Sequence, residues 1–281
     1  MRRPRTGAWW RQLRRAALTG GVMVWALWSG AMARPCQAGV VAVGKVIDGS
    51  TNPPSWSGAR VMAEPPHVRA LIVSAFDDFV RHQNIDQFLS VVSARYTEGT
   101  LERLLCSDDA RTRRAAVMAL GHLGSFAVND ALARCLSDPD PSVRELAHHA
   151  LWAIWFRADT PSHNARLEKV RECNARGRHE LAIRLASDLI EHAPRFAEAY
   201  NQRAIAHFCL DRFEESVRDC VQALVYNPNH FGAMQGMGQC LLRLNRREEA
   251  LGIFRRACKL MPYNHDLKQW VEVLEAEAEG R

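Results

Sequence analysis

The sequence predicts an all-α fold in which pairs of helices repeat along the chain and stack into a right-handed helical-repeat solenoid. Pro194, Pro228 and Pro262 recur with a 34-residue period, and each follows an apolar helical run. Proline ends such a run because it cannot donate the next helical hydrogen bond. Further upstream, two segments align with each other at a 31-residue offset. Repeats of these lengths are typical of solenoids, which present long binding surfaces.

The three repeats closed by these prolines cover 163–196, 197–230 and 231–264. In the middle repeat, Tyr200 and Ala204 are separated by about one helical turn and so share one face of the first helix. Ala204 and Gly238 occupy one repeat position, where two helices must approach closely. An early aromatic residue, small residues at the crossings and a closing proline resemble the tetratricopeptide (TPR) family. In the first repeat, Arg166 and Val170 stand at the aromatic and small positions, so the resemblance is closer for the other two.

Residues 99–157 hold the second type of repeat. At the same 31-residue offset, Asp109 aligns with Asp140 and Arg113 aligns with Arg144. Each aspartate stands just ahead of a predicted helix, where a carboxylate caps free amides and is favoured by the helix dipole. We expect the arginines to pair with neighbouring aspartates in a ladder between stacked units. The segment resembles HEAT repeats of the phycobilisome-lyase-like type, which implies stacked helices but does not imply lyase chemistry.

The chain divides into five predicted segments. They are a signal peptide or membrane anchor (1–33), an extended linker (34–65), HEAT-like helical repeats with N-terminal capping helices (66–157), three TPR repeats (163–264) and a C-terminal capping helix (265–281). The linker is rich in Gly, Pro and Ser, which favours an extended chain. Only a short connection separates the two repeat blocks, so we expect one continuous stack with the HEAT units first. Capping helices are expected because a terminal repeat leaves its apolar face uncovered.

The leader, residues 1–33, predicts export. It holds six arginines and no acid, and an uncharged apolar stretch ends in Ala31-Met32-Ala33. A basic start, an apolar core and a small-residue site are typical of a secretory signal. The alternative is an uncleaved anchor, because the stretch is near the minimum length of a spanning helix. In both cases we expect the repeats to be exported, either free in the periplasm or facing it from a membrane anchor.

The charge of the chain restricts the classes of partner that we expect, and the positions of its cysteines indicate the state of their thiols. The net charge of +6 belongs to the leader, since the remainder holds 31 basic and 31 acidic residues. A neutral body lacks the footprint of a nucleic-acid-binding protein, so we predict no nucleic-acid partner, and membrane contact only through an uncleaved leader. Most of the eight cysteines fall inside predicted helices, and no C-x-x-C pair occurs. We expect free thiols packed as small hydrophobic groups, with one bridge between adjacent helices left open.

No motif predicts an enzyme. His179-Glu180 begins like a zinc-protease motif, but Ile183 stands where the second histidine ligand is required. We therefore predict no catalytic residue, no metal site and no cofactor. The aromatic pair Trp152 and Trp155 either anchors a partner or fills the space between the two repeat types, and we expect the second role.

In TPR proteins, the first helices of the repeats line a concave groove for extended or helical peptides. By this resemblance, the residues predicted to bind a partner are Arg171, Asn174, Asn201, Ile205, Phe208, Gln235, Gln239 and Leu242, with Leu167 at an equivalent position. They form an amide-rich groove with apolar spots; the alternative is that these side chains are merely solvated. The clamp by which co-chaperone TPR domains hold a C-terminal carboxylate is not expected, because its positions hold Leu167, Arg171, Gln202, Gly232 and Gly236.

These observations predict an exported, non-enzymatic scaffold that binds a partner protein or peptide through the concave face of the repeats. Two alternatives stay open. One is a membrane-anchored regulatory or sensing subunit of an envelope enzyme complex. The other is a lyase-like modifying protein, which takes the resemblance to lyase-like HEAT repeats literally and requires a reactive thiol in a pocket.

Overall fold

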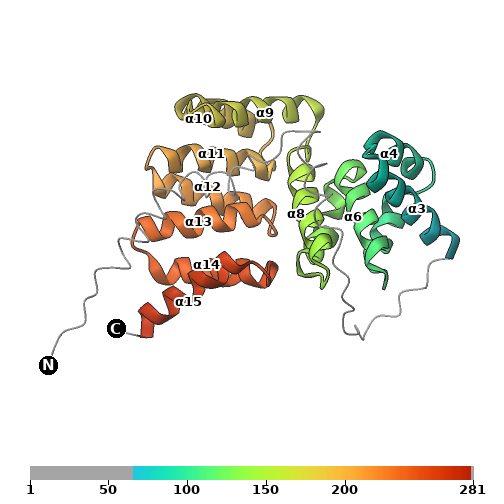
Figure 1. Ribbon diagram of the computed structural model, residues 1–281. Helices are drawn as coiled ribbons and strands as arrows, with labels where there is room; N and C mark the ends of the chain where they lie inside the picture. The colour runs from blue at the N-terminus through green and yellow to red at the C-terminus, as the bar shows by residue number, and fades with distance from the viewer. Residues whose placement is uncertain (1–65, 280–281) are drawn as a thin grey trace.

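The computed structural model describes residues 66–279, which form 13 α-helices and two short 3-10 helices and contain no strand. Figure 1 shows these helices in two groups that lie side by side. The HEAT block consists of α3 (Pro66–His82), α4 (Ile85–Ser93), α5 (Glu98–Leu104), α6 (Ala110–Leu123), η1 (Phe126–Val128), α7 (Asn129–Arg134), η2 (Cys135–Ser137) and α8 (Pro141–Trp155). The TPR block consists of α9 (Pro161–Ala175), α10 (His179–His192), α11 (Ala197–Cys209), α12 (Phe213–Tyr226), α13 (Phe231–Arg243), α14 (Arg247–Leu260) and α15 (His265–Glu279).

The predicted all-α helical-repeat fold is confirmed. The predicted signal peptide or anchor and the linker lie outside the described residues, so they stay predictions. Between residues 66 and 279, no helix combines the length and the apolarity needed to cross a membrane. All seven cysteines in this part of the chain are free thiols, and Cys135, Cys220 and Cys240 are buried.

The HEAT units repeat in the structure with the register that the sequence predicts. The start of α7 is offset from the start of α5 by the same interval as the start of α8 from the start of α6. Asp109 caps α6 by accepting the amides of Arg111 and Thr112, and Asp140 caps α8 by accepting the amide of Val143. Both predicted caps are confirmed, and they satisfy amides that the first turn of a helix leaves free.

Of the two arginines in the predicted ladder, Arg113 pairs with an aspartate of the neighbouring unit and Arg144 has other partners. Arg113 makes two hydrogen bonds of 2.8 Å to Asp138 of the following unit, and both side chains are buried. The equivalent Arg144 instead donates to the carbonyls of Asp138 and Pro139, and its guanidinium lies 4.0 Å from the ring centre of Tyr263. The ladder thus ends on Tyr263, a residue of the TPR block, rather than on a further aspartate.

The TPR block is built from three helix pairs, α9–α10, α11–α12 and α13–α14, and the final helix α15. Each pair turns through a residue in the left-handed backbone region: Gly177 (φ 69°), Asp211 (φ 57°) and Asn245 (φ 59°). These residue types tolerate that region best, and the three positions follow the 34-residue period. Gly238 confirms the predicted close crossing, because a Cβ there would lie 2.5 Å from Cζ of Phe254 on α14.

The two blocks join through α8. In Figure 1, α8 runs across the right-hand ends of the stacked TPR helices, where the chain passes from one repeat to the next. The contacts agree with this view: α8 residues pack against His230 and Phe231 after α12 and against Tyr263 after α14. The join is therefore made to the inter-repeat loops, and the sequence periods alone did not indicate this arrangement.

Candidate functional site

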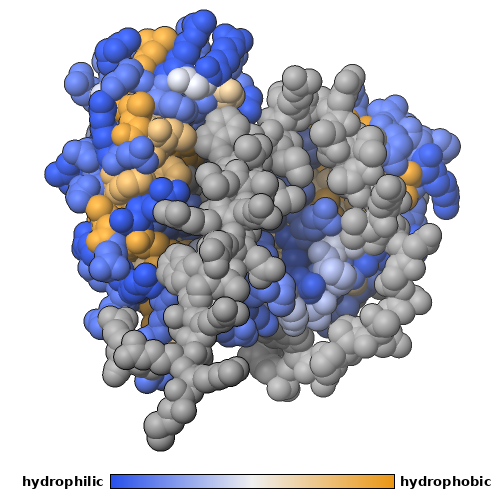
Figure 2. Space-filling model, turned by 60° about the vertical axis from the view of Figure 1, so that its left-hand side comes forward, coloured by the Kyte–Doolittle hydropathy of each residue, from blue (hydrophilic) through white to orange (hydrophobic). Residues whose placement is uncertain are grey.

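The structure leaves five of the eight predicted partner-binding residues accessible. These half-buried residues come from α9, α11 and α13, and we call them the A-helix strip: Arg171, Phe208, Gln235, Gln239 and Leu242. Phe208 and Leu242 occupy the same position in successive repeats. The strip offers apolar groups, two carboxamides and one guanidinium, a mixture that suits the side chains and backbone of a peptide. Figure 2 shows one face of the molecule, on which apolar patches alternate with polar side chains.

The other three predicted residues are buried, and for them the prediction of a groove-facing side chain is wrong. Asn174 is 2% exposed and donates hydrogen bonds to the carbonyl and side-chain oxygens of Gln202. Asn201 is 0% exposed and donates to Oε1 of Glu198 at 3.1 Å. Ile205 is also 0% exposed and belongs to the hydrophobic core. Leu167, at an equivalent position on α9, is likewise buried. The helical period correctly groups these residues but does not reveal that neighbouring repeats cover them.

Aromatic and cationic groups surround the accessible strip. The ring of Phe208 meets that of Phe213 edge to face at 5.6 Å, and Arg243 lies 5.9 and 5.7 Å from the two ring centres. At the α9 end of the strip, Arg171 donates a hydrogen bond to Glu168. This hydrogen bond raises the pKa of Arg171, and burial acts in the opposite direction. A cation over the face of an aromatic ring is attracted to it, so these contacts stabilise the positions of both groups.

The aromatic pair on α8 fills the join between the blocks, as we expected. Trp152 and Trp155 are 4% and 1% exposed, and Trp155 stacks on His230 at 4.3 Å. A Cβ on Gly232 would lie 2.7 Å from Cη2 of Trp152, so glycine at this position makes room for the indole. Burial on this scale leaves the two indoles unable to anchor an external partner in this conformation.

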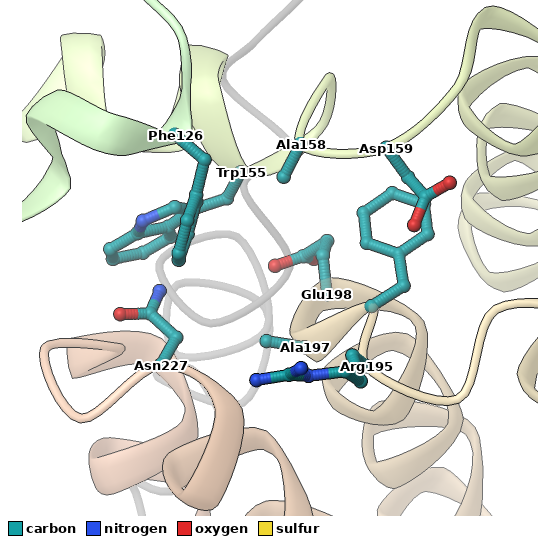
Figure 3. A pocket seen from close by; sticks show the side chains of 9 residues that line it. Phe126, Trp155, Ala158, Asp159, Arg195, Ala197, Glu198 and Asn227 are labelled. Carbon is teal, nitrogen blue, oxygen red and sulfur yellow. The ribbon is translucent and has the colours of Figure 1, made fainter.

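The join also contains a pocket that sequence reasoning missed. Its volume is about 50 Å³, and its walls come from both blocks: Phe126, Trp155, Ala158, Asp159, Arg195, Phe196, Ala197, Glu198 and Asn227. Figure 3 shows the Asn227 amide facing the Trp155 indole, with a carboxylate oxygen of Glu198 pointing toward them. We call it the seam pocket. One signal was available in the sequence: Asn227 stands where the other two repeats have Ala193 and Met261.

A buried carboxylate lies beside this pocket. The side chain of Glu198 is 0% exposed and accepts hydrogen bonds from Asn201, from Gln202 at 2.8 Å and from His230 at 2.7 Å. Nδ1 of His230 accepts the Ala233 amide, so Nε2 carries the hydrogen that is donated to Glu198. Glu198 also lies in the first turn of α11, where the helix dipole favours a negative charge. These interactions compensate for the loss of water around the carboxylate.

The described residues bear on two kinds of reactive centre, a metal site and a nucleophilic thiol. No group of three or more His, Cys, Asp or Glu side chains among them could hold a metal ion. Burial raises the pKa of the Cys135 thiol to about 12 and that of the Cys240 thiol to about 11. A thiol becomes nucleophilic as a thiolate, so these two are poorly suited to the reactive role that the lyase-like alternative requires.

Comparison with known proteins agrees with both repeat types. A family model for HEAT repeats matches residues 64–152 and 97–186. The chain is 26% identical over 103 residues to a TPR repeat-containing protein of Rhizobium etli, which covers 37% of this chain and 50% of the relative. It is 30% identical over 73 residues to a DnaJ homolog subfamily C member 7 homolog of Dictyostelium discoideum (26% of this chain, 14% of the relative). It is 28% identical over 86 residues to anaphase-promoting complex subunit 3 of Schizosaccharomyces pombe (31% and 13%).

The chain spans half the length of the Rhizobium relative and smaller shares of the other two. Their similarity therefore concerns the repeats rather than a whole protein, and the phycobilisome-lyase-like subtype stays a prediction. The repeats themselves are supported by the 31- and 34-residue periods, by the helix pairs and by the comparisons. The chain is a helical-repeat protein that combines HEAT repeats with TPR repeats.

Proposed function

We propose that this protein is an exported, non-enzymatic scaffold that binds a partner protein or peptide through the A-helix strip. The observation that carries the proposal is the line of accessible apolar and amide groups along α11 and α13, from Phe208 to Gln239 and Leu242. Relatives with TPR repeats support a role in protein–protein interaction. The acid-free, arginine-rich leader supports export.

Each part of the strip has a distinct role in binding. Phe208 supplies an apolar anchor, which is typically worth about 2 kcal/mol when a partner covers it. Gln235 and Gln239 each carry a donor and an acceptor, so they can pair with the backbone amides of an extended peptide. Because the body of the protein is neutral, salt should weaken the complex only modestly.

The test begins with capture of the partner from an envelope extract by the full chain. The double variant Phe208→Ala with Gln239→Ala should then bind this partner at least about tenfold more weakly, because it loses the anchor and one amide pair. Affinity is measured by calorimetry, and circular dichroism verifies that the helical content is unchanged. The matched control is Val225→Ala with Gln222→Ala, which removes one apolar and one amide side chain from the exposed face of α12.

Normal binding by the strip variant would disprove the proposed site. If Leu123→Ala, which changes an exposed side chain of α6, abolishes binding while the strip variant binds normally, the partner is held on the HEAT side. If the α12 control loses affinity and the strip variant does not, the partner binds the outer helices instead.

A further inference from the structure

The side-chain amide of Asn227 lines the seam pocket, and the hydrogen bonds of its neighbours fix the orientation of this amide. Nε1 of Trp155 can only donate, and it donates to Oδ1 of Asn129 at 2.7 Å. Asn129 therefore turns its Nδ2 toward Asn227, and the atom of Asn227 that receives it at 3.1 Å must be Oδ1. The same Oδ1 accepts the backbone amide of Asn229. Nδ2 of Asn227 thus points the other way, is fully buried and has no partner among the described residues.

Glu198, which also lines the pocket, has an acceptor position without a partner. A carboxylate offers about four acceptor positions, and the hydrogen bonds to Glu198 use three of them, two at Oε1 and one at Oε2. The remaining position belongs to Oε2. The pocket is thus lined by one residue with an unpaired donor, Asn227, and by one residue with an unpaired acceptor position, Glu198. A group that both accepts and donates a hydrogen bond matches this pair.

The charges around the pocket disfavour ionic ligands. Glu198 and Asp159 contribute two carboxylates, and Arg195 contributes one exposed guanidinium. Burial acts to raise the pKa of Asp159, but hydrogen bonds from the Thr160 amide and His163 outweigh it and lower that pKa. An anion is therefore repelled by the two carboxylates. A cation leaves the Asn227 donor unpaired, which is costly for a buried amide.

Asn227 is not required by the fold of the repeat. The same position is Ala193 in the first repeat and Met261 in the third, and both are buried as well. The two apolar residues end α10 and α14 as Asn227 ends α12. Oδ1 of Asn227 has a structural role because it bonds Asn129 and Asn229, but the buried Nδ2 makes no hydrogen bond and costs stability. This indicates that the amide serves a ligand.

We propose that the seam pocket is a binding subsite for a neutral carboxamide or hydroxyl group, such as the side-chain amide of a partner's Asn or Gln. The volume of about 50 Å³ holds a group of about three to five heavy atoms. Trp155 and Phe126 cover its faces, Asn227 donates to its oxygen, and Glu198 accepts its hydrogen. The subsite is separate from the A-helix strip, so either can fail without the other.

The test uses the ¹⁵N-labelled full chain and follows the indole N–H resonance of Trp155, which the variant Trp155→Phe identifies. Acetamide, acetate and methylammonium are titrated as probes of a neutral, an anionic and a cationic ligand. We expect acetamide to shift the Trp155 resonance in a saturable way, with a dissociation constant of about 1 mM or weaker. Acetate and methylammonium should bind at least about tenfold more weakly. The resonance of the exposed Trp270 should not follow the titration.

Two variants from one loop complete the test. Asn227→Ala installs the residue of the first repeat and should abolish the acetamide response. Asn229→Ala removes a carboxamide that bonds Asp130 outside the pocket and should leave the response intact. If Asn227→Ala fails to fold, acetone replaces the variant, because it can accept from Asn227 but cannot donate to Glu198; it should bind more weakly than acetamide.

Three results would overturn the proposal. The first is tighter binding of acetate or methylammonium than of acetamide. The second is the absence of a saturable response to any probe, which means that the pocket holds water only. The third is an acetamide response that survives in Asn227→Ala. None of these depends on whether the A-helix strip binds a partner.

Discussion

At the scale of single residues, the described glycines differ in how much room surrounds them. A Cβ on Gly232 would lie 2.7 Å from the Trp152 ring, and a Cβ on Gly238 would lie 2.5 Å from the Phe254 ring. By contrast, nothing lies within 4 Å of a Cβ built on Gly252, which is exposed on α14. Identical substitutions at the crowded and the open positions should therefore change stability in opposite directions.

Gly232→Ala should destabilise the protein, because the added methyl displaces Trp152 from the join between the blocks. Overpacking of this kind costs about 1–3 kcal/mol. Gly252→Ala should stabilise the protein by about 0.5–1 kcal/mol, since alanine is the better helix former and meets no neighbour. Urea unfolding of both variants measures the two signs. A stable Gly232→Ala variant would show that Trp152 has room to move.

Gly238→Leu should damage the fold far more than Gln239→Leu. A large side chain at position 238 cannot fit against Phe254, and the expected cost is about 1–3 kcal/mol or more. Gln239 is half-buried on the A-helix strip and tolerates the same replacement. Thermal unfolding compares the adjacent positions directly. Equal melting temperatures would mean that the repeat register is wrong.

At the scale of elements, the units of the HEAT block are tied by a buried ion pair in addition to apolar packing. Arg113 on α6 reaches Asp138 ahead of α8, and each side chain is 9% exposed. Arg113 also donates to the carbonyl oxygens of Ser107 and Asp108, so it holds the loop before its own helix. The buried Arg113 guanidinium makes all these hydrogen bonds, so replacing either Arg113 or Asp138 leaves the other buried charge without its partner.

Asp138→Ala should cost about 3–5 kcal/mol, because it leaves the Arg113 charge buried and uncompensated. The control is Glu275→Ala, which breaks the exposed pair with Arg255 and should cost less than about 1 kcal/mol. Denaturant unfolding measures both. Similar costs for the two variants would show that water reaches Arg113 when its partner is lost.

At the scale of the whole molecule, the two blocks are joined by aromatic stacking and a chain of hydrogen bonds. Trp155 stacks on His230, and the bonds from Trp155 through Asn129 reach Asn227 in the TPR block. These contacts link residues that are far apart in the sequence. Unfolding of one block exposes the large aromatic groups of the other, so the blocks should lose their structure together.

We therefore predict one cooperative thermal transition for the full chain, without any requirement for a metal ion. Calorimetry, with and without a chelator, tests this expectation. Two well-separated transitions, each assigned to one block, would show that the join contributes little to stability.

The join should also make stability depend on pH. His148 on α8 stacks on Phe231 at 4.6 Å, and burial, with a smaller effect from His149, lowers its pKa from 6.5 to about 4. The folded state thus binds this proton less readily than the unfolded state. Stability from this group is complete above about pH 6.5 and is lost as the pH falls toward 4, by at most about 3 kcal/mol.

The variant His148→Gln should lose part of this pH dependence, whereas His149→Gln, at an exposed position, should retain it. Unfolding free energies measured between about pH 4 and 7 compare the variants with the parent chain. Parallel curves for the parent and His148→Gln would show that other histidines account for the acid sensitivity.

The sequence by itself determined the helix pairs, their registers and several single residues. The caps Asp109 and Asp140, the ion pair of Arg113 and the close crossing at Gly238 all followed from residues within one or two repeats. Interactions of this range produce a periodic pattern in the sequence, because each unit contacts its neighbour in the same way.

Only the tertiary structure decided which faces are covered and how the blocks meet. Asn201 and Ile205 have the spacing of groove residues, yet they are buried, because spacing defines a face and not its neighbour. The contact of α8 with the inter-repeat loops, and with it the seam pocket, depends on pairs such as Asn129 and Asn227. Such pairs occur once in the chain and follow no period, so the sequence marks Asn227 as an exception within its repeat but does not identify its partner.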